Sequence, residues 1–300
     1  MSVPAAFTGV IIIWSTTPLA IQWSGDEVGY LFGITSRMIT GMLAGLLVAA
    51  LFRVRLPWHA DARCTYLAAG LGMFIAMLLV YRASRVIPSG WIAVIFGIAP
   101  MITGLMAHYW LPGKSLTITR VAGMLLGTCG IAIMLAGTRS IGPNATMGIV
   151  SMLISVTAYS ASAVTVQRIG ANIPPLATTI GGLVVTVILL CFTFALTGKP
   201  LPVEVPVRVA ASIVYLGIIG SLLGFALYYY ILGKMDATRV ALITLITPVI
   251  SLLLGELLNG ETIRSGAWIG TAVILSGLML FEYGHILNRL RSLPAGSNNS

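Results

Sequence analysis

Ten apolar runs, each close to the length of a bilayer-spanning helix, restrict most strongly how this chain can fold. A helix that crosses the hydrocarbon core needs about 20 mostly apolar residues. Only 8% of the residues are charged, whereas soluble domains carry roughly a quarter. The predicted spans are about 4–22, 29–52, 64–82, 86–109, 119–137, 146–167, 175–196, 207–231, 238–258 and 264–284. The sequence therefore predicts an all-α integral membrane protein with ten transmembrane helices.

Two of these runs share one pattern: a proline lies mid-run, a hydroxyl follows three residues later, and an ionisable residue follows five after that. The residues are Pro100, Thr103 and His108 in the first copy, and Pro248, Ser251 and Glu256 in the second. A proline inside a helix frees a carbonyl and kinks the chain, and lipid tolerates this only where protein or a wet cavity satisfies the carbonyl. The two helix breaks therefore predict a site between two related halves.

Further correspondences extend over the chain at offsets of 145 to 149 residues. They pair Trp14-Ser15 and Gln22 with Tyr159-Ser160 and Gln167, Tyr81 with Tyr230, and Gly123 and Gly130 with Gly270 and Gly277. The sequence thus predicts two copies of a five-helix unit, 1–140 and 141–286, followed by a tail of 287–300. Because five spans are an odd number, the second copy is inverted. Inverted repeats are typical of alternating-access transporters, whose substrate site lies near the midplane of the bilayer.

The basic residues favour a topology with both termini in the cytoplasm. With that orientation the inner loops and tail hold ten Lys and Arg residues and the outer loops hold six, as the positive-inside rule expects. These residues are scattered singly and form no patch or stripe, so the net charge of +9 does not indicate nucleic-acid binding. No basic segment precedes the first apolar run, which is therefore interpreted as a span and not as a cleaved signal peptide.

The arrangement resembles the drug/metabolite transporter superfamily, in its bacterial EamA-type branch. The resemblance rests on five plus five spans, Trp14-Ser15 in the first, Arg37 in the second, and Pro248 about thirteen residues before the Gly260-Glu261 pair. It implies a small carrier of the bacterial inner membrane, commonly an exporter of amino acids, other metabolites or toxic compounds. The first half departs from the pattern, since it closes on Gly113-Lys114 instead of Gly-Glu. The two ends of the carrier are therefore not assumed to behave alike.

Glu256 and His108 are the ionisable candidates of the two proline runs. Glu256 lies in an otherwise apolar segment, where a carboxylate is costly unless it is paired, hydrated or protonated. It is interpreted either as a substrate- or proton-coupling group or as an interfacial carboxylate at the outer headgroups. His108 is interpreted either as a proton relay or as an interfacial histidine beside Tyr109 and Trp110.

Arg37 is a full positive charge about two turns inside the second run. It could bind an anionic group of a substrate, or it could pair with Asp26 or Glu27 as a structural latch at the outer boundary. The remaining candidates suit the wall of a moderately polar cavity, although each could also serve helix packing. They are Trp14, Ser15, Gln22, Tyr81, Tyr159, Ser160, Gln167 and Tyr230.

Enzymatic functions find no support in the sequence, which has no HExxH, GxSxG or Walker motif and no paired aspartates for a metal-bound diphosphate. No catalytic residue, metal or cofactor is expected. The prediction is a secondary active transporter that moves small metabolites by alternating access, an exporter of amino acids or similar solutes that is open to proton coupling. The alternatives are a non-transporting scaffold or enzyme subunit, and a flippase for a lipid-linked substrate. The expected partners are a small-molecule substrate and the lipid bilayer, and several small-xxx-small glycine pairs are also compatible with a homodimer.

Overall fold

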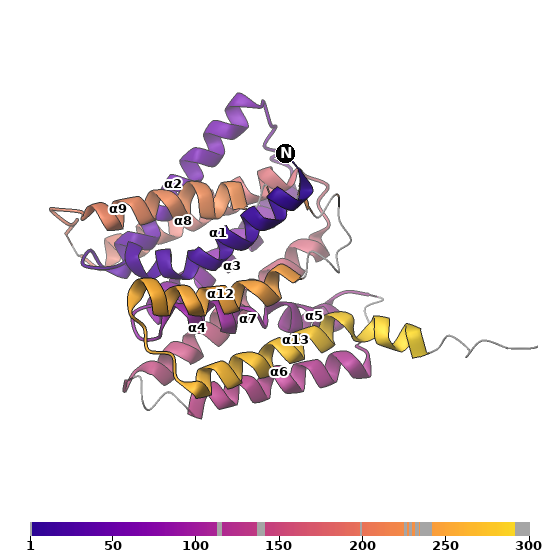
Figure 1. Ribbon diagram of the computed structural model, residues 1–300. Coiled ribbons are helices and arrows are strands. Elements are labelled where there is room, and N and C mark those ends of the chain that lie inside the picture. The colour runs from indigo at the N-terminus through magenta and orange to yellow at the C-terminus, as the bar shows by residue number, and fades with distance from the viewer. Residues whose placement is uncertain are drawn as a thin grey trace, which may run out of the picture.

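The computed structural model describes residues 2–112, 116–136, 142–198, 200–224, 227, 230, 231, 234 and 242–291, with side chains through 283. All regular secondary structure in these ranges is helical (Figure 1). The elements are α1 (Val3–Ser24), α2 (Tyr30–Leu51), α3 (Ala60–Ala83), α4 (Ser89–Phe96), α5 (Ala99–Trp110), α6 (Ile118–Ala136), α7 (Ala145–Ile169), α8 (Pro175–Leu196), α9 (Val207–Val214), the π-helix η2 (Tyr215–Leu223), α12 (Leu242–Asn259) and α13 (Ser265–Arg291).

The helices confirm the prediction of an all-α membrane protein. Within the described ranges, nine helical segments are long and apolar enough to cross a bilayer, and α4 and α5 together form one of them. The segment Val207–Leu223, made of α9 and η2, is a shorter apolar helix at the position of the eighth predicted span. The backbone of α13 stays helical through Arg291 and so includes the first residues of the predicted tail.

The two mid-run prolines act differently. The fourth span is broken between α4 and α5, and Pro100 lies in the first turn of α5, where its missing N–H costs nothing. Pro248 lies inside an unbroken α12. The predicted mid-run kink therefore becomes a complete break only in the first copy. Gly97 precedes Pro100 by three residues while Leu245 precedes Pro248, and a glycine lowers the stability of the helix at that point.

The last helices of the two halves pack against each other in opposite directions. A Cβ on Gly123 would lie 2.5 Å from the Gly277 carbonyl oxygen, and one on Gly130 would lie 2.7 Å from that of Gly270. As α6 advances from 123 to 130, α13 therefore runs back from 277 to 270. Figure 1 shows the two helices side by side. The glycines found by their repeat spacing thus form the closest contact of an antiparallel pair, as inverted repeats require.

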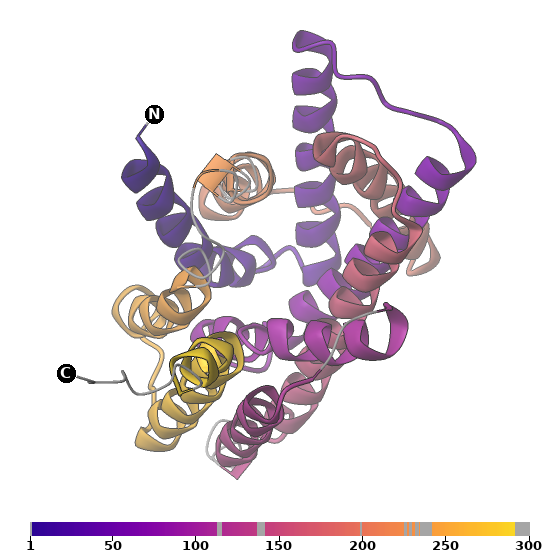
Figure 2. The ribbon, with the colours of Figure 1, turned by 90° about the vertical axis from the view of Figure 1, so that its right-hand side faces the viewer.

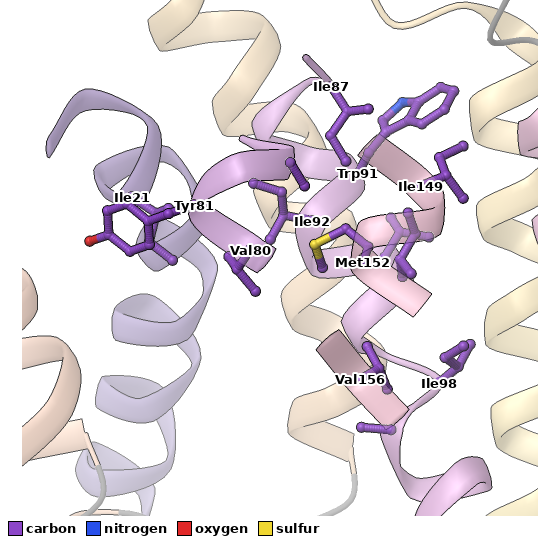
Figure 3. Close-up of a cluster of buried hydrophobic side chains, with 14 of the residues drawn as sticks. Ile21, Val80, Tyr81, Ile87, Trp91, Ile92, Ile98, Ile149, Met152 and Val156 are labelled. Carbon is purple, nitrogen blue, oxygen red and sulfur yellow. The ribbon is translucent and has the colours of Figure 1, made fainter. Parts of the chain in front are cut away.

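Large apolar side chains from both halves form the main core. Figure 3 shows Ile21, Val80 and Tyr81 at one side of this cluster and Trp91 and Ile149 at the other. The start of α1 and the end of α13 lie at the same end of the bundle, which faces the viewer in Figure 2. We call this the terminal end, and the opposite end, where α1 and α12 finish, the far end.

Candidate functional site

Two of the hydroxyl contacts that join the halves involve the residue three positions after a predicted helix-breaking proline. The Ser251 hydroxyl donates to the Ser15 carbonyl oxygen at 2.7 Å and thereby joins α12 to α1. In the other half, the Thr103 hydroxyl donates to the Ser160 hydroxyl at 3.0 Å and joins α5 to α7. Each contact links the proline-bearing span of one repeat to the first span of the other. The residues paired by sequence offset thus occupy equivalent places at the interface.

The first span also contacts the π-helix of the second repeat. The hydroxyls of Thr16 and Tyr215 lie 2.6 Å apart. Gly217 of η2 lies directly against α2, since a Cβ on it would be 3.1 Å from the Arg37 carbonyl oxygen. A π-helix is rare and is often found at functional sites. The structure therefore places η2 between α1 and α2, inside the membrane-spanning region.

Arg37 lies on α2 where η2 crosses it. It is 6% exposed, and its Nε and Nη1 have no hydrogen-bond partner. Asp26, one of its two predicted partners, instead forms an ion pair with Arg85, whose Nη1 lies 2.7 Å from Asp26 Oδ1. Glu27, the other one, is exposed and has positive φ. The outer-boundary latch predicted for Arg37 is therefore not formed between described residues.

A polar cluster at the far end joins three helices. The Asn259 side chain accepts from Trp23 Nε1 at 3.0 Å and donates to Gln22 Oε1 at 3.2 Å and Glu261 Oε1 at 2.9 Å. Glu261 Oε1 also accepts from the backbone N–H of Ser89 at 3.0 Å. We call these five residues, Gln22, Trp23, Ser89, Asn259 and Glu261, the far-end latch.

The latch places a carboxylate at the start of a helix. Ser89 is the first residue of α4, and a negative charge there is stabilised by the free N–H groups and the helix dipole. Arg208 on α9 of the second repeat also contacts the latch, since its guanidinium lies 4.0 Å from the centroid of the Trp23 ring. Together these contacts hold the ends of α1 and α12 to the start of α4.

A pocket of about 690 Å³ opens beside the latch. It lies between the loops that join α3 to α4, α6 to α7 and α12 to α13. The polar side chains that line it are Gln22, Arg85, Asn144, Glu261, Thr262, Arg264 and Ser265, together with Trp91, whose indole N–H is buried without a partner. In the described part of the chain, no group of three or more His, Cys, Asp or Glu side chains could hold a metal ion.

The structure separates the other ionisable candidates from this cluster. Glu256 is exposed on α12, next to Leu257, which is 77% exposed. His108 is half-buried, with its ring 5.0 Å from that of the exposed Tyr109. The exposure of Glu256 and the contact of His108 with Tyr109 are what the interfacial interpretations of these two residues expect. Trp23, Asn259 and Glu261 were not predicted as site residues, and the only signal for them was the Gly260-Glu261 pair at the end of the proline run.

The cavity-wall candidates divide into two groups. Ser15, Ser160 and Tyr81 are buried, and Tyr81 Oη accepts from the Ser24 hydroxyl at 3.1 Å. Gln22 belongs to the latch. The remaining candidates lie at the periphery: Trp14 is half-buried, Tyr159 has its ring 5.3 Å from that of Phe96, Gln167 is exposed, and Tyr230 has its ring 5.3 Å from the Lys234 ammonium. Gly113 and Lys114, noted for their departure from the family pattern, lie outside the described residues.

Comparison with known proteins gives one family over nearly the whole chain. The model of the EamA-like transporter family matches residues 3–136 and again residues 146–283. A probable terminal-alkyne amino-acid exporter of Streptantibioticus cattleyicolor is 23% identical over 275 residues, which is 91% of this chain and 90% of the relative. The uncharacterized inner membrane transporter YedA of Escherichia coli K12 is 23% identical over 286 residues, 94% of this chain and 91% of the relative.

Two further matches agree with this family. The uncharacterized transporter YvbV of Bacillus subtilis (strain 168) is 21% identical over 276 residues, covering 90% of this chain and 88% of the relative. A protein of known crystal structure superposes with a TM-score of 0.64 at 23% identity, over 96% of this chain and 99% of that one. At this level of identity the structural match supports the fold alone.

Proposed function

Because the chain belongs to the EamA-like transporter family, we propose that it is a secondary active exporter of small polar solutes, amino acids foremost. It is an integral membrane transporter, not an enzyme. The proposed location is the bacterial inner membrane with both termini in the cytoplasm, so that the far end faces outward. The name of the Streptantibioticus cattleyicolor relative supports the export of amino acids, and that of YedA supports the inner membrane.

The observation that carries the proposal is the equivalent pairing of Ser251 with Ser15 and of Thr103 with Ser160. In transporters built from inverted repeats, alternating access is largely a rocking of one repeat against the other about a site at their interface. Ser251 follows Pro248, which removes one backbone hydrogen bond inside α12, and Thr103 follows the break between α4 and α5. The interface can therefore change its angle there at less cost than within a regular helix.

The latch supports a conformation closed at the far end. Gln22 is bonded within it, while its repeat equivalent Gln167 is exposed at the terminal end. In the proposed orientation the latch lies at the outer end, beside the pocket of about 690 Å³. The sequence contains no Walker motif for ATP, so a proton gradient or solute exchange would drive the cycle.

Reconstituted flux tests this function. The purified protein would be placed in liposomes loaded with a panel of labelled amino acids, nucleobases and sugars, and efflux would be measured with and without a pH gradient and with external unlabelled solute. We expect saturable efflux of at least one amino acid above protein-free liposomes. Efflux of none of them, from protein shown to be folded and inserted, would refute the proposed solute class.

Two glutamates, Glu256 in the last turn of α12 and Glu261 just after the helix, provide a matched comparison. Glu261→Gln weakens the latch and should slow efflux, because the far end no longer closes firmly between cycles. Glu256→Gln makes the same chemical change at an exposed position and should retain parental efflux. Equal loss in the two variants would contradict the assignment of the latch as a gate.

A further inference from the structure

The unpaired guanidinium of Arg37 is the strongest physical anomaly in the described part of the molecule. Arg37 begins about 10 Å along α2 from its first residue, taking 1.5 Å per residue, and it is 6% exposed. Its Nε and Nη1 are buried and donate to nothing. Burial of an unpaired charge is costly, and in a membrane-spanning segment such groups pair with one another or mark a substrate path.

Among the described residues, no carboxylate pairs with Arg37. The sequence has eight acidic residues, and the seven that are described all lie in loops or near the ends of helical spans. Asp26 is paired with Arg85, Glu261 belongs to the latch, and Glu27, Glu204 and Glu256 are exposed. Asp61 lies in the first turn of α3, where Arg37 does not reach, and Glu282 lies at the end of the α13 span. The counter-anion must therefore come from outside the described chain.

The surroundings of Arg37 combine features expected of a binding site. It lies at the contact between the repeats, where α2 of the first meets η2 of the second. Two other buried hydroxyls also have no hydrogen-bond partner, those of Thr35 on the same helix and of Ser15 on α1. A guanidinium forms two parallel hydrogen bonds with a carboxylate, which makes it selective for that group over a neutral carbonyl.

We propose that Arg37 is the docking group for the carboxylate of the transported solute. The proposal rests on the proposed transport function and narrows its substrate class to solutes with a free carboxylate. It predicts that cationic and neutral solutes without this group are poor substrates. Because the arginine lies between the repeats, a bound carboxylate would contact both halves during the cycle.

The first test compares ligands on the parent protein. For the amino acid with the largest efflux, affinity would be measured by tryptophan fluorescence against two analogues, its carboxamide, which lacks the anionic group, and its N-acetyl derivative, which keeps it. We expect the carboxamide to bind at least tenfold more weakly and the N-acetyl derivative to keep a measurable affinity. Equal binding of the amino acid and its carboxamide would overturn the proposal while leaving transport itself established.

The second test repeats this comparison in Arg37→Gln and Arg37→Lys. If Arg37 holds the carboxylate, the difference between the amino acid and its carboxamide should vanish in Arg37→Gln and be partly retained in Arg37→Lys. An undiminished difference in Arg37→Gln would assign the carboxylate to another residue. Binding assays in methanesulfonate and in chloride, neither of which is a carboxylate, would test for a bound inorganic anion. Competition by chloride, with no discrimination between carboxylate and carboxamide, would also overturn the assignment.

A third measurement does not depend on ligand. If Arg37 has a structural role instead, Arg37→Met should lower the melting temperature of the ligand-free protein. A docking group without a partner predicts an unchanged or higher melting temperature, because the variant removes an uncompensated buried charge. A clear fall in melting temperature, restored by Arg37→Lys, would favour the structural role. If the parent protein transports none of the solutes in the efflux assay, that result counts against the proposed transport function and not against the role of Arg37.

Discussion

Asn259 provides the sharpest perturbation of the far-end latch, because one side chain there makes three hydrogen bonds. Asn259→Ala would remove the bonds to Trp23, Gln22 and Glu261. A neutral hydrogen bond contributes about 0.5–1.5 kcal/mol net, and one to a charged group about 1.5–3 kcal/mol. The three together are therefore worth about 2.5–6 kcal/mol in the closed state, before water replaces part of them when that end opens.

The equilibrium between the closed and open far end shifts only by the difference between the free energies that the substitution costs the two states. If water recovers about half of the lost bonds, the closed state is weakened by roughly 1–3 kcal/mol, which corresponds to a rise of about 5- to 150-fold in the population of the open state. In Asn259→Ala the far end should therefore open far more often while the protein stays folded.

Accessibility of an engineered cysteine would measure this change. Cys64, Cys129 and Cys191 are all exposed and would first be replaced by serine. Ala20 is buried on α1, within one turn of Gln22, so a cysteine there reports opening of the far end. A membrane-impermeant maleimide applied from the outside should label this cysteine at least fivefold faster in Asn259→Ala than in the parent.

The matched control is Asn144→Ala, which makes the same change at the same end of the bundle. Asn144 precedes α7 and its side chain makes no capping hydrogen bond. Its labelling rate should equal that of the parent. Equal rates in all three proteins would refute the latch as the closure of the far end.

Three further predictions concern stability, measured by thermal unfolding in detergent. Gly130→Ala should destabilise the fold by about 1–3 kcal/mol, because its Cβ would lie 2.6 Å from Ile274 and 2.7 Å from the Gly270 carbonyl oxygen, whereas Gly266→Ala meets nothing within 4 Å and should be neutral. Ser251→Ala should cost about 1 kcal/mol through loss of its bond to Ser15, and no loss would mean that this contact does not hold α12 to α1. Asp26→Asn should change stability by less than about 1 kcal/mol, since the ion pair with Arg85 is 41–43% exposed, and a larger effect would show a structural role for this pair.

The sequence was sufficient for the class of fold and for the contact between repeats. Membrane spans follow from local composition, and repeat spacing identified both the glycines that join α6 to α13 and the hydroxyls at positions 103 and 251. These features could be predicted because inverted repeats that pack on one another must use equivalent residues at equivalent places. The boundaries of the two units, 1–140 and 141–286, and the cytoplasmic position of the tail stay predictions.

Near the end of α12 the sequence drew attention to Glu256, whereas the structure bonds Glu261 between helices. Glu256 attracted attention because it interrupts an apolar run, whereas Glu261 follows the helix and resembles an ordinary loop residue. Five residues separate Ser251 from Glu256, which is a turn of about 140° around the helix axis, so Glu256 faces away from the buried side that holds Ser251. Glu261 instead reaches the N-terminus of α4, and that contact joins residues 172 positions apart. A single sequence gives no local signal for such a pairing.

The two ends of the molecule cannot be closed by the same chemistry, even though the repeats are related. At the far end, a carboxylate accepts hydrogen bonds from a helix N-terminus and from Asn259. At the corresponding place in the first repeat the sequence has Lys114, which has only donors, and Pro112 lies two residues before it, as Asn259 lies two before Glu261. A lysine cannot accept from a backbone N–H, so the equivalent latch cannot form there. The two repeats thus share packing contacts but differ in sequence at these ends, and if the far-end latch is a gate, the proposed carrier should rest closed at the end that has the carboxylate.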